Sequence, residues 1–253
     1  MKRIVVFAVG LLNCALVTAQ AGKANTQQVK NNPHLKVFNQ SVTSGDINTA
    51  VMALNYYVSG DGANSVYEDT LAMLYMQQGS YVQCFYWADK RLKAKPEDNA
   101  LMEMKAICLD KLQQPKESIA LFEKLYNKTQ SPYHAYKLME LQYGIKRLAE
   151  CLGTALSVEK QTIKPEYTMT YNAGEQMGRT YLQAGIYNIH ALALYDLDKK
   201  AEARTYFEKA LALDSTFLLA RQNLQALDAI ESGANKVNPD KPSTQASPAN
   251  KQD

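Results

Sequence analysis

The sequence predicts an all-α protein in which about five similar helix pairs follow one another and a further helix closes the row. One observation behind this is a spacing of 34 residues between Gly45, Gly79 and Gln113. A second is the small side chain found five residues beyond each of these three positions. A third is the recurrence of apolar residues every three or four positions, which is typical of amphipathic helices. A single helix pair cannot bury its own apolar face, so repeated pairs imply a stack.

The helices are expected in pairs separated by short turns. Asn32 can cap the first helix, and Pro33 can begin it, because proline is tolerated at the first helical position. Proline also opens the helices that start at residues 115 and 132. The expected pairs cover residues 33–43 with 46–58, 65–78 with 80–93, 97–112 with 115–127, 132–143 with 145–159, and 183–197 with 199–213.

The fourth and fifth pairs are separated by an insertion. We place the turn of the fourth pair at Gly144, followed by Ala149 and Gly153, and that of the fifth at Asp198, followed by Ala203 and Phe207. These two sets lie 54 residues apart, which is one repeat plus about twenty inserted residues.

The insertion, residues 161–182, has the composition of strands. Tyr167, Met169 and Tyr171 alternate with threonines, which is a period of two in good strand formers. Residues 172–175 are a turn candidate, and residues 176–181 can return as a second strand. We therefore expect a short β-hairpin that projects between pairs four and five; a partly ordered loop is the alternative.

A closing helix is expected over residues 216–231, because a terminal repeat needs one polar face. Its apolar positions are Leu218, Leu219, Leu224 and Leu227, and its polar positions are Arg221, Gln222, Gln225 and Asp228.

Both ends of the chain differ from this helical region. Residues 1–21 have the three parts of a secretory signal peptide, with cleavage expected near Ala19 or Ala21. Cys14 is a weak candidate for lipidation, because Asn13 precedes it and apolar residues follow it. Residues 22–31 are expected to be flexible, and residues 233–253 to be a disordered tail, because both stretches hold almost nothing apolar.

Composition and motifs exclude several functions. Removal of Lys2 and Arg3 with the signal would leave a net charge of about +1, which gives no electrostatic case for nucleic acid. The apolar run in the signal is too short for a stable membrane span. His34, His134 and His190 are isolated, and we expect His190 to be packed and hydrogen-bonded. We expect no enzyme activity, cofactor or metal.

The cysteines of the mature chain, Cys84, Cys108 and Cys151, are odd in number and widely spaced. They are therefore expected to be small buried side chains and not a disulfide framework. A disulfide between Cys84 and Cys108 is the alternative.

The repeat resembles the tetratricopeptide repeat (TPR) family over residues 32–232. The best match, residues 65–98, has Leu71, Ala72, Tyr75, Gly79, Cys84, Ala88, Leu92 and Pro96. Small residues twelve apart appear as Ala72/Cys84, Ala106/Ser118 and Ala191/Ala203. The first and fourth pairs depart from this pattern with Phe38/Ala50 and Lys137/Ala149. The export signal is similar to those of Bacteroidetes-type bacteria.

The resemblance implies a right-handed α-solenoid in which the first helix of each pair lines a concave groove that binds peptides or protein segments. Transfer of the groove positions gives a protein-binding set of Asp69, Met73, Met76, Glu103, Ile107, Asp110, His134, Leu138, Leu141, Asn188, Leu192 and Tyr195. Family members that grip a terminal carboxylate use lysine, asparagine and arginine there. In this chain Asp69, Glu103 and His134 occupy those positions. Binding of a C-terminal carboxylate is therefore not implied.

The expected function is a protein–protein interaction scaffold or assembly factor in the bacterial cell envelope, exported to the periplasm or associated with the envelope. One alternative is a structural protein that forms homodimers through its end surfaces. Another is a non-catalytic accessory subunit of an envelope enzyme or uptake complex.

Overall fold

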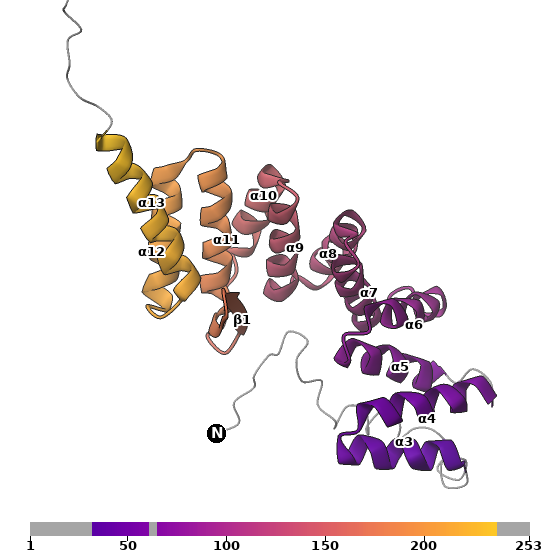
Figure 1. The fold of residues 1–253 in the computed structure, drawn as a ribbon. Helices are drawn as coiled ribbons and strands as arrows, with labels where there is room; N and C mark the ends of the chain where they lie inside the picture. The colour runs from indigo at the N-terminus through magenta and orange to yellow at the C-terminus, as the bar shows by residue number, and fades with distance from the viewer. Residues whose placement is uncertain (1–31, 61–64, 237–253) are drawn as a thin grey trace, which may run out of the picture.

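The computed structural model describes residues 32–60 and 65–236, and in these ranges the chain is a row of helix pairs with one small sheet. The helix pairs follow one another in a single row, and their axes turn along it (Figure 1). The predicted all-α stack of five pairs, a hairpin and a closing helix is confirmed. The signal peptide, Cys14, the flexible segment 22–31 and most of the tail lie outside the described residues.

The observed helices match the expected pairs to within a few residues. The pairs are α3 (Pro33–Ser44) with α4 (Ile47–Gly60), α5 (Ser65–Gln77) with α6 (Tyr81–Ala94), α7 (Asn99–Lys111) with α8 (Pro115–Thr129), α9 (Pro132–Gly144) with α10 (Leu148–Val158), and α11 (Leu182–Asp196) with α12 (Lys200–Leu213). Asn32 caps α3 as predicted: its side-chain oxygen accepts hydrogen bonds from the backbone N–H groups of His34 and Leu35. None of the described helices is long and apolar enough to cross a bilayer.

Each pair turns at one residue in the left-handed conformation. These residues, with φ between 60° and 78°, are Gly45, Gly79, Gln113, Lys146 and Asp198. Five residues beyond each of them lies a side chain that is 0% exposed. These buried side chains are Ala50, Cys84, Ser118, Cys151 and Ala203. A sharp turn followed by a close helix–helix contact is therefore the unit that the sequence repeats.

The predicted turn of the fourth pair was wrong by two residues. The left-handed residue is Lys146 and not Gly144, so Cys151 and Ala155 are buried where Ala149 and Gly153 were expected, and these two are exposed. A left-handed lysine costs roughly 1–2 kcal/mol. Burial of the apolar side of α10 offsets this cost.

The insertion forms the predicted hairpin, and the loop alternative is excluded. Strand β1 (Thr168–Ala173) pairs antiparallel with β2 (Gln176–Tyr181), and Gly174 with φ 65° supplies the two-residue turn. One face of the hairpin packs against the helices, where the Met169 side chain is 8% exposed. Only its other face and its tip project, below the start of α11 (Figure 1).

The closing helix α13 (Leu218–Lys236) packs on α12 and has the expected polar outer face. Leu227 is buried as expected, together with Phe217 and Ala220, which were not among the predicted apolar positions. The helix extends to residue 236, so the first residues assigned to the disordered tail are helical.

Candidate functional site

The candidate site is one face of the first helices in pairs two to five. Three positions on each helix lie ten, six and three residues before the left-handed turn residue, and the resulting spacings of four and three place them on one side of the helix. In chain order these positions are Asp69, Met73 and Met76 on α5; Glu103, Ile107 and Asp110 on α7; Tyr136, Glu140 and Tyr143 on α9; and Asn188, Leu192 and Tyr195 on α11. We call these twelve residues the first-helix face.

On α9 the structure replaces all three residues selected from the sequence. His134, Leu138 and Leu141 are buried, at 7%, 3% and 8% exposure. They had been chosen by counting back from Gly144, and counting from the true turn residue gives Tyr136, Glu140 and Tyr143. The signal that could have found them is the strict 34-residue period, which points to residue 147, next to Lys146.

The other nine predicted site residues lie on the first-helix face, but their accessibility differs. Met73, Met76 and Asn188 are buried, at 8%, 8% and 5% exposure. The partly exposed residues are Asp69, Glu103, Ile107, Asp110, Leu192 and Tyr195.

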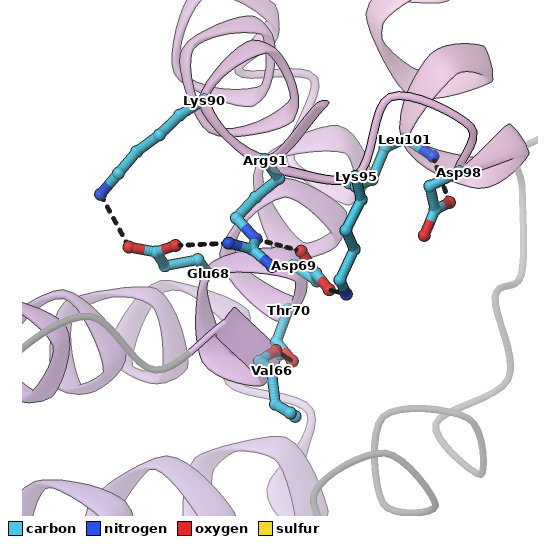
Figure 2. Close-up of polar contacts among 9 residues, drawn as sticks. All are labelled: Val66, Glu68, Asp69, Thr70, Lys90, Arg91, Lys95, Asp98 and Leu101. Atoms are coloured by element: carbon cyan, nitrogen blue, oxygen red, sulfur yellow. Dashed lines mark hydrogen bonds and ion pairs between the residues drawn. The ribbon is translucent and has the colours of Figure 1, made fainter. Parts of the chain in front are cut away.

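Asp69 at the α5 end of the face belongs to an ion-pair network with α6, which Figure 2 shows. Its two carboxylate oxygens accept hydrogen bonds from Arg91 Nε and Lys95 Nζ, both at 2.7 Å. The neighbouring Glu68, 1% exposed, accepts from Lys90 Nζ at 2.7 Å and lies 3.4 Å from an Arg91 nitrogen. Because Asp69 already holds two cations, it fixes α5 to α6 and offers little to a ligand.

The middle of the face, on α7 and α9, combines carboxylates with aromatic rings. The Tyr136 hydroxyl donates to Glu140 at 2.7 Å, and Lys137 Nζ donates to the other oxygen of Glu140 at 2.7 Å. Burial and the Glu140 charge raise the pKa of Tyr136 well above its ordinary value, so this hydroxyl stays protonated and keeps donating. Glu103 on α7 lies 3.2 Å from His134 Nε2.

The last part of the face is tied to its neighbours. Asn188 accepts a hydrogen bond from Asn223 on α13 at 3.0 Å. Lys146 pairs with Asp196 at 2.6 Å, and its ammonium lies 4.7 Å from the centre of the Tyr143 ring. Leu192 and Tyr195 are partly buried and pack against a cluster of α11, α12 and α13 that includes Leu194, Phe207 and Leu227.

The hairpin covers one end of the face. A Cβ atom built on Gly185 would lie 2.1 Å from Met169 Sδ and 3.2 Å from the Tyr136 ring. Met169 of β1 therefore lies between α9 and α11, over the start of α11. The part of the face open to a partner lies beyond the hairpin.

His190 and the cysteines are structural, as predicted. His190 is 3% exposed, and its Nδ1 lies 2.5 Å from a Glu159 oxygen, whose other oxygen accepts from the Tyr206 hydroxyl at 3.1 Å. Cys84, Cys108 and Cys151 are buried free thiols, and burial raises the pKa of Cys151 to about 12. No group of three potential metal ligands is found in the described ranges.

These features define an all-α solenoid of TPR-type helix pairs. Solved structures with the same fold include YrrB, described as a TPR protein with an unusual peptide-binding site. Its TM-score is 0.61 at 14% identity, over 84% of this chain and 100% of that one. MamA has a TM-score of 0.59 at 16% identity, over 72% and 90% of the two chains. At these identities the likeness shows the fold alone. No family model and no curated protein matches the sequence.

Proposed function

We propose that this protein is a non-catalytic scaffold or assembly factor that binds a protein segment on its first-helix face. The observation that carries the proposal is the continuity of this face. Partly exposed acidic, aliphatic or aromatic side chains lie at equivalent positions on the first helices of four successive pairs, from Asp69 to Tyr195. A preformed surface on rigid helices loses little conformational entropy on binding. The peptide-binding site ascribed to YrrB shows that a protein with this fold can bind a peptide.

We further propose that the protein works in the bacterial cell envelope, after export and removal of its signal peptide. The charged, apolar and small-residue order of residues 1–21 supports this. Mass spectrometry of the protein from its native cells tests it. A mature chain that begins at Gln20 or Gly22 is expected, and a chain that still starts at Met1 in the cytoplasm would contradict it.

The binding proposal is tested by photo-crosslinking in native envelopes. A crosslinking residue placed at Ile107 should capture a specific partner, and the double variant Ile107→Lys with Tyr195→Ala should no longer co-purify it. Both sites are partly exposed, so helicity should be unchanged. The matched control is Leu156→Lys on α10 with Leu213→Ala on α12, two exposed positions on second helices, at 53% and 40% exposure. If the partner still co-purifies with the Ile107/Tyr195 variant, the proposal is wrong.

A second candidate function is self-association, which the outer side of the first two pairs favours. Met52 and Tyr56 on α4 and Val82 and Tyr86 on α6 are apolar or aromatic and between 58% and 62% exposed. Large apolar side chains left exposed on neighbouring repeats can mark an interface. Static light scattering over a range of concentrations tests this: a dimer that the variant Met52→Lys with Tyr56→Ala dissociates supports it, and a monomer throughout rules it out.

A further inference from the structure

The first-helix face is acidic. Of its twelve residues, Asp69, Glu103, Asp110 and Glu140 carry carboxylates and none carries a positive charge. Asp69 is occupied by Arg91 and Lys95. Asp110 lies 3.4 Å from Lys111 Nζ, and Glu140 lies 2.7 Å from Lys137 Nζ. The side chains of Glu103, Asp110 and Glu140 are 28%, 40% and 38% exposed, so these three carboxylates on α7 and α9 are open to solvent.

These carboxylates are only partly satisfied by the protein itself. A carboxylate can accept about four hydrogen bonds. Each Glu140 oxygen accepts one, from Tyr136 or Lys137, and Glu103 accepts one from His134. Lys137 shows that an ammonium group fits at Glu140, where its nitrogen lies 2.7 Å from the oxygen. Capacity for a further cationic donor therefore remains on both side chains.

An independent observation points to the same place. The Tyr133 hydroxyl, at the start of α9, is buried and has no hydrogen-bond partner among the described residues. Burial raises the pKa of the Tyr133 hydroxyl, and the negative charges of Glu103 and Glu140 raise it further. A buried hydroxyl without a partner is costly and needs an explanation. The Tyr133 ring lies 5.7 Å from that of His134, which contacts Glu103, so the hydroxyl belongs to the same cluster, and a cationic donor that enters it would satisfy the hydroxyl oxygen and the carboxylate together.

We propose that Glu103, Glu140 and Tyr133 form a subsite for a cationic side chain, lysine or arginine, of the segment that binds the first-helix face. This inference rests on the proposed function and names the chemistry of the partner. The carboxylates pair with the ammonium or guanidinium group, and the Tyr133 oxygen accepts one of its N–H donors. The rings of Tyr136 and Tyr143 on the same helix already lie 5.6 Å and 4.7 Å from the ammonium groups of Lys137 and Lys146, which shows that cations are accommodated beside this part of the face.

The test uses fluorescently labelled peptides in which serine alternates with lysine, with glutamine or with glutamate, and measures fluorescence anisotropy. The lysine peptide is expected to bind, and to bind more weakly as salt is raised. The variant Glu103→Gln with Glu140→Gln should raise its Kd at least about tenfold. The matched control, Glu117→Gln with Glu208→Gln, removes the same charge from the exposed sides of α8 and α12 and should change Kd less than about twofold.

Tyr133→Phe separates a binding role from a structural one. Removal of an unsatisfied buried hydroxyl should leave the melting temperature unchanged or raise it, while the Kd of the lysine peptide should rise about threefold. A Kd that stays the same shows that the hydroxyl makes no contact with the cation and overturns this part of the assignment. Glu140→Gln alone is the second variant if loss of the Glu103–His134 contact disturbs folding.

Three outcomes overturn the subsite. They are no binding of the lysine peptide up to about 1 mM, equal binding of the lysine and glutamine peptides, and equal effects of the two double variants. The crosslinking experiment at Ile107 keeps this failure distinct from failure of the proposed function. If the Glu103/Glu140 variant still captures the partner, binding on the first-helix face is retained and the cationic subsite is rejected.

Discussion

Met169 of the hairpin lies in the space that a side chain on Gly185 would need. A Cβ atom on Gly185 would stand 2.1 Å from Met169 Sδ, although 16 residues separate the two in the chain. The glycine is inside α11, where it normally destabilises a helix relative to alanine. Its presence there is explained by the approach of the hairpin, which joins the insertion to the fourth and fifth pairs.

In Gly185→Ala the Met169 side chain must move from its buried place, which costs about 1–3 kcal/mol, while the helical preference for alanine recovers about 1 kcal/mol. The net result should be a destabilisation of at most about 2 kcal/mol. Urea unfolding followed by circular dichroism measures this. The control is Gly153→Ala in α10, where nothing lies within 4 Å of the new Cβ and stability should rise by about 0.5–1 kcal/mol. If both substitutions stabilise the protein equally, the hairpin does not pack as described.

Tyr171 should hold the start of the closing helix. Its hydroxyl accepts a hydrogen bond from Leu218 N–H at 3.0 Å, its ring lies 4.8 Å from that of Phe217, and it crosses Gly178 of the paired strand. Tyr171→Phe keeps the ring and removes the cap, so it should cost about 1 kcal/mol. Amide hydrogen exchange in the first turn of α13 should be faster in this variant than in the wild type. Exchange unchanged at Leu218 would contradict the role, and Tyr181→Phe on the outer face of the hairpin is the control.

Local pattern explains why so much of the fold was predictable. The five helix pairs follow from the 34-residue period, and the hairpin from a change of period from 3.6 to two. The turn at Lys146 was missed because glycine is the usual left-handed residue, so Gly144 attracted the assignment. That error moved the site residues on α9 from Tyr136 to His134. The contact of Tyr171 with Leu218 spans 47 residues and has no local signal.

The left-handed turn residues give a paired prediction on stability. Gln113 has φ 61° and Gly45 has φ 78°, at equivalent turns. Gln113→Gly should stabilise the protein by roughly 0.5–1 kcal/mol, because the left-handed penalty of about 1–2 kcal/mol exceeds the entropic cost of glycine. Gly45→Gln should destabilise it by a similar amount, and no atom lies close enough to Gly45 to add a steric effect. Thermal unfolding of both variants measures this, and shifts of the same sign would contradict it.

Arg91 is expected to be the most sensitive charged residue of the ion-pair network in Figure 2. It is 8% exposed and bridges Glu68 and Asp69. Arg91→Met would leave the 1%-exposed Glu68 with Lys90 alone, so stability should fall by about 3–5 kcal/mol. Lys93→Met removes an ion pair whose lysine is 78% exposed and should change stability by less than about 0.5 kcal/mol. If the two variants lower the free energy of unfolding in urea by similar amounts, burial does not determine how much an ion pair contributes to stability.

Alkaline pH should weaken the protein, and Cys151 gives the cleanest test of the reason. Burial raises the pKa of its thiol from 9.0 to about 12 in the folded state. Between pH 9 and about 12 the thiol ionises readily in the unfolded chain but not in the folded one. The contribution of the buried thiol to stability is therefore complete below pH 9, the pKa in the unfolded chain, and is lost as the pH rises to about 12, the pKa in the folded chain. The pKa of Tyr206, raised to about 12 mainly by burial, acts in the same direction.

Stability of the wild type should therefore fall between pH 9 and 11 more steeply than that of Cys151→Ala, compared as slopes because the substitution also changes packing. Parallel slopes would show that ionisation of Cys151 does not cause the loss of stability.

At pH 8 the native thiols of Cys84, Cys108 and Cys151 should not react with a thiol reagent, since all three are buried. After denaturation without reductant all three should react, and loss of two of them would reveal a disulfide.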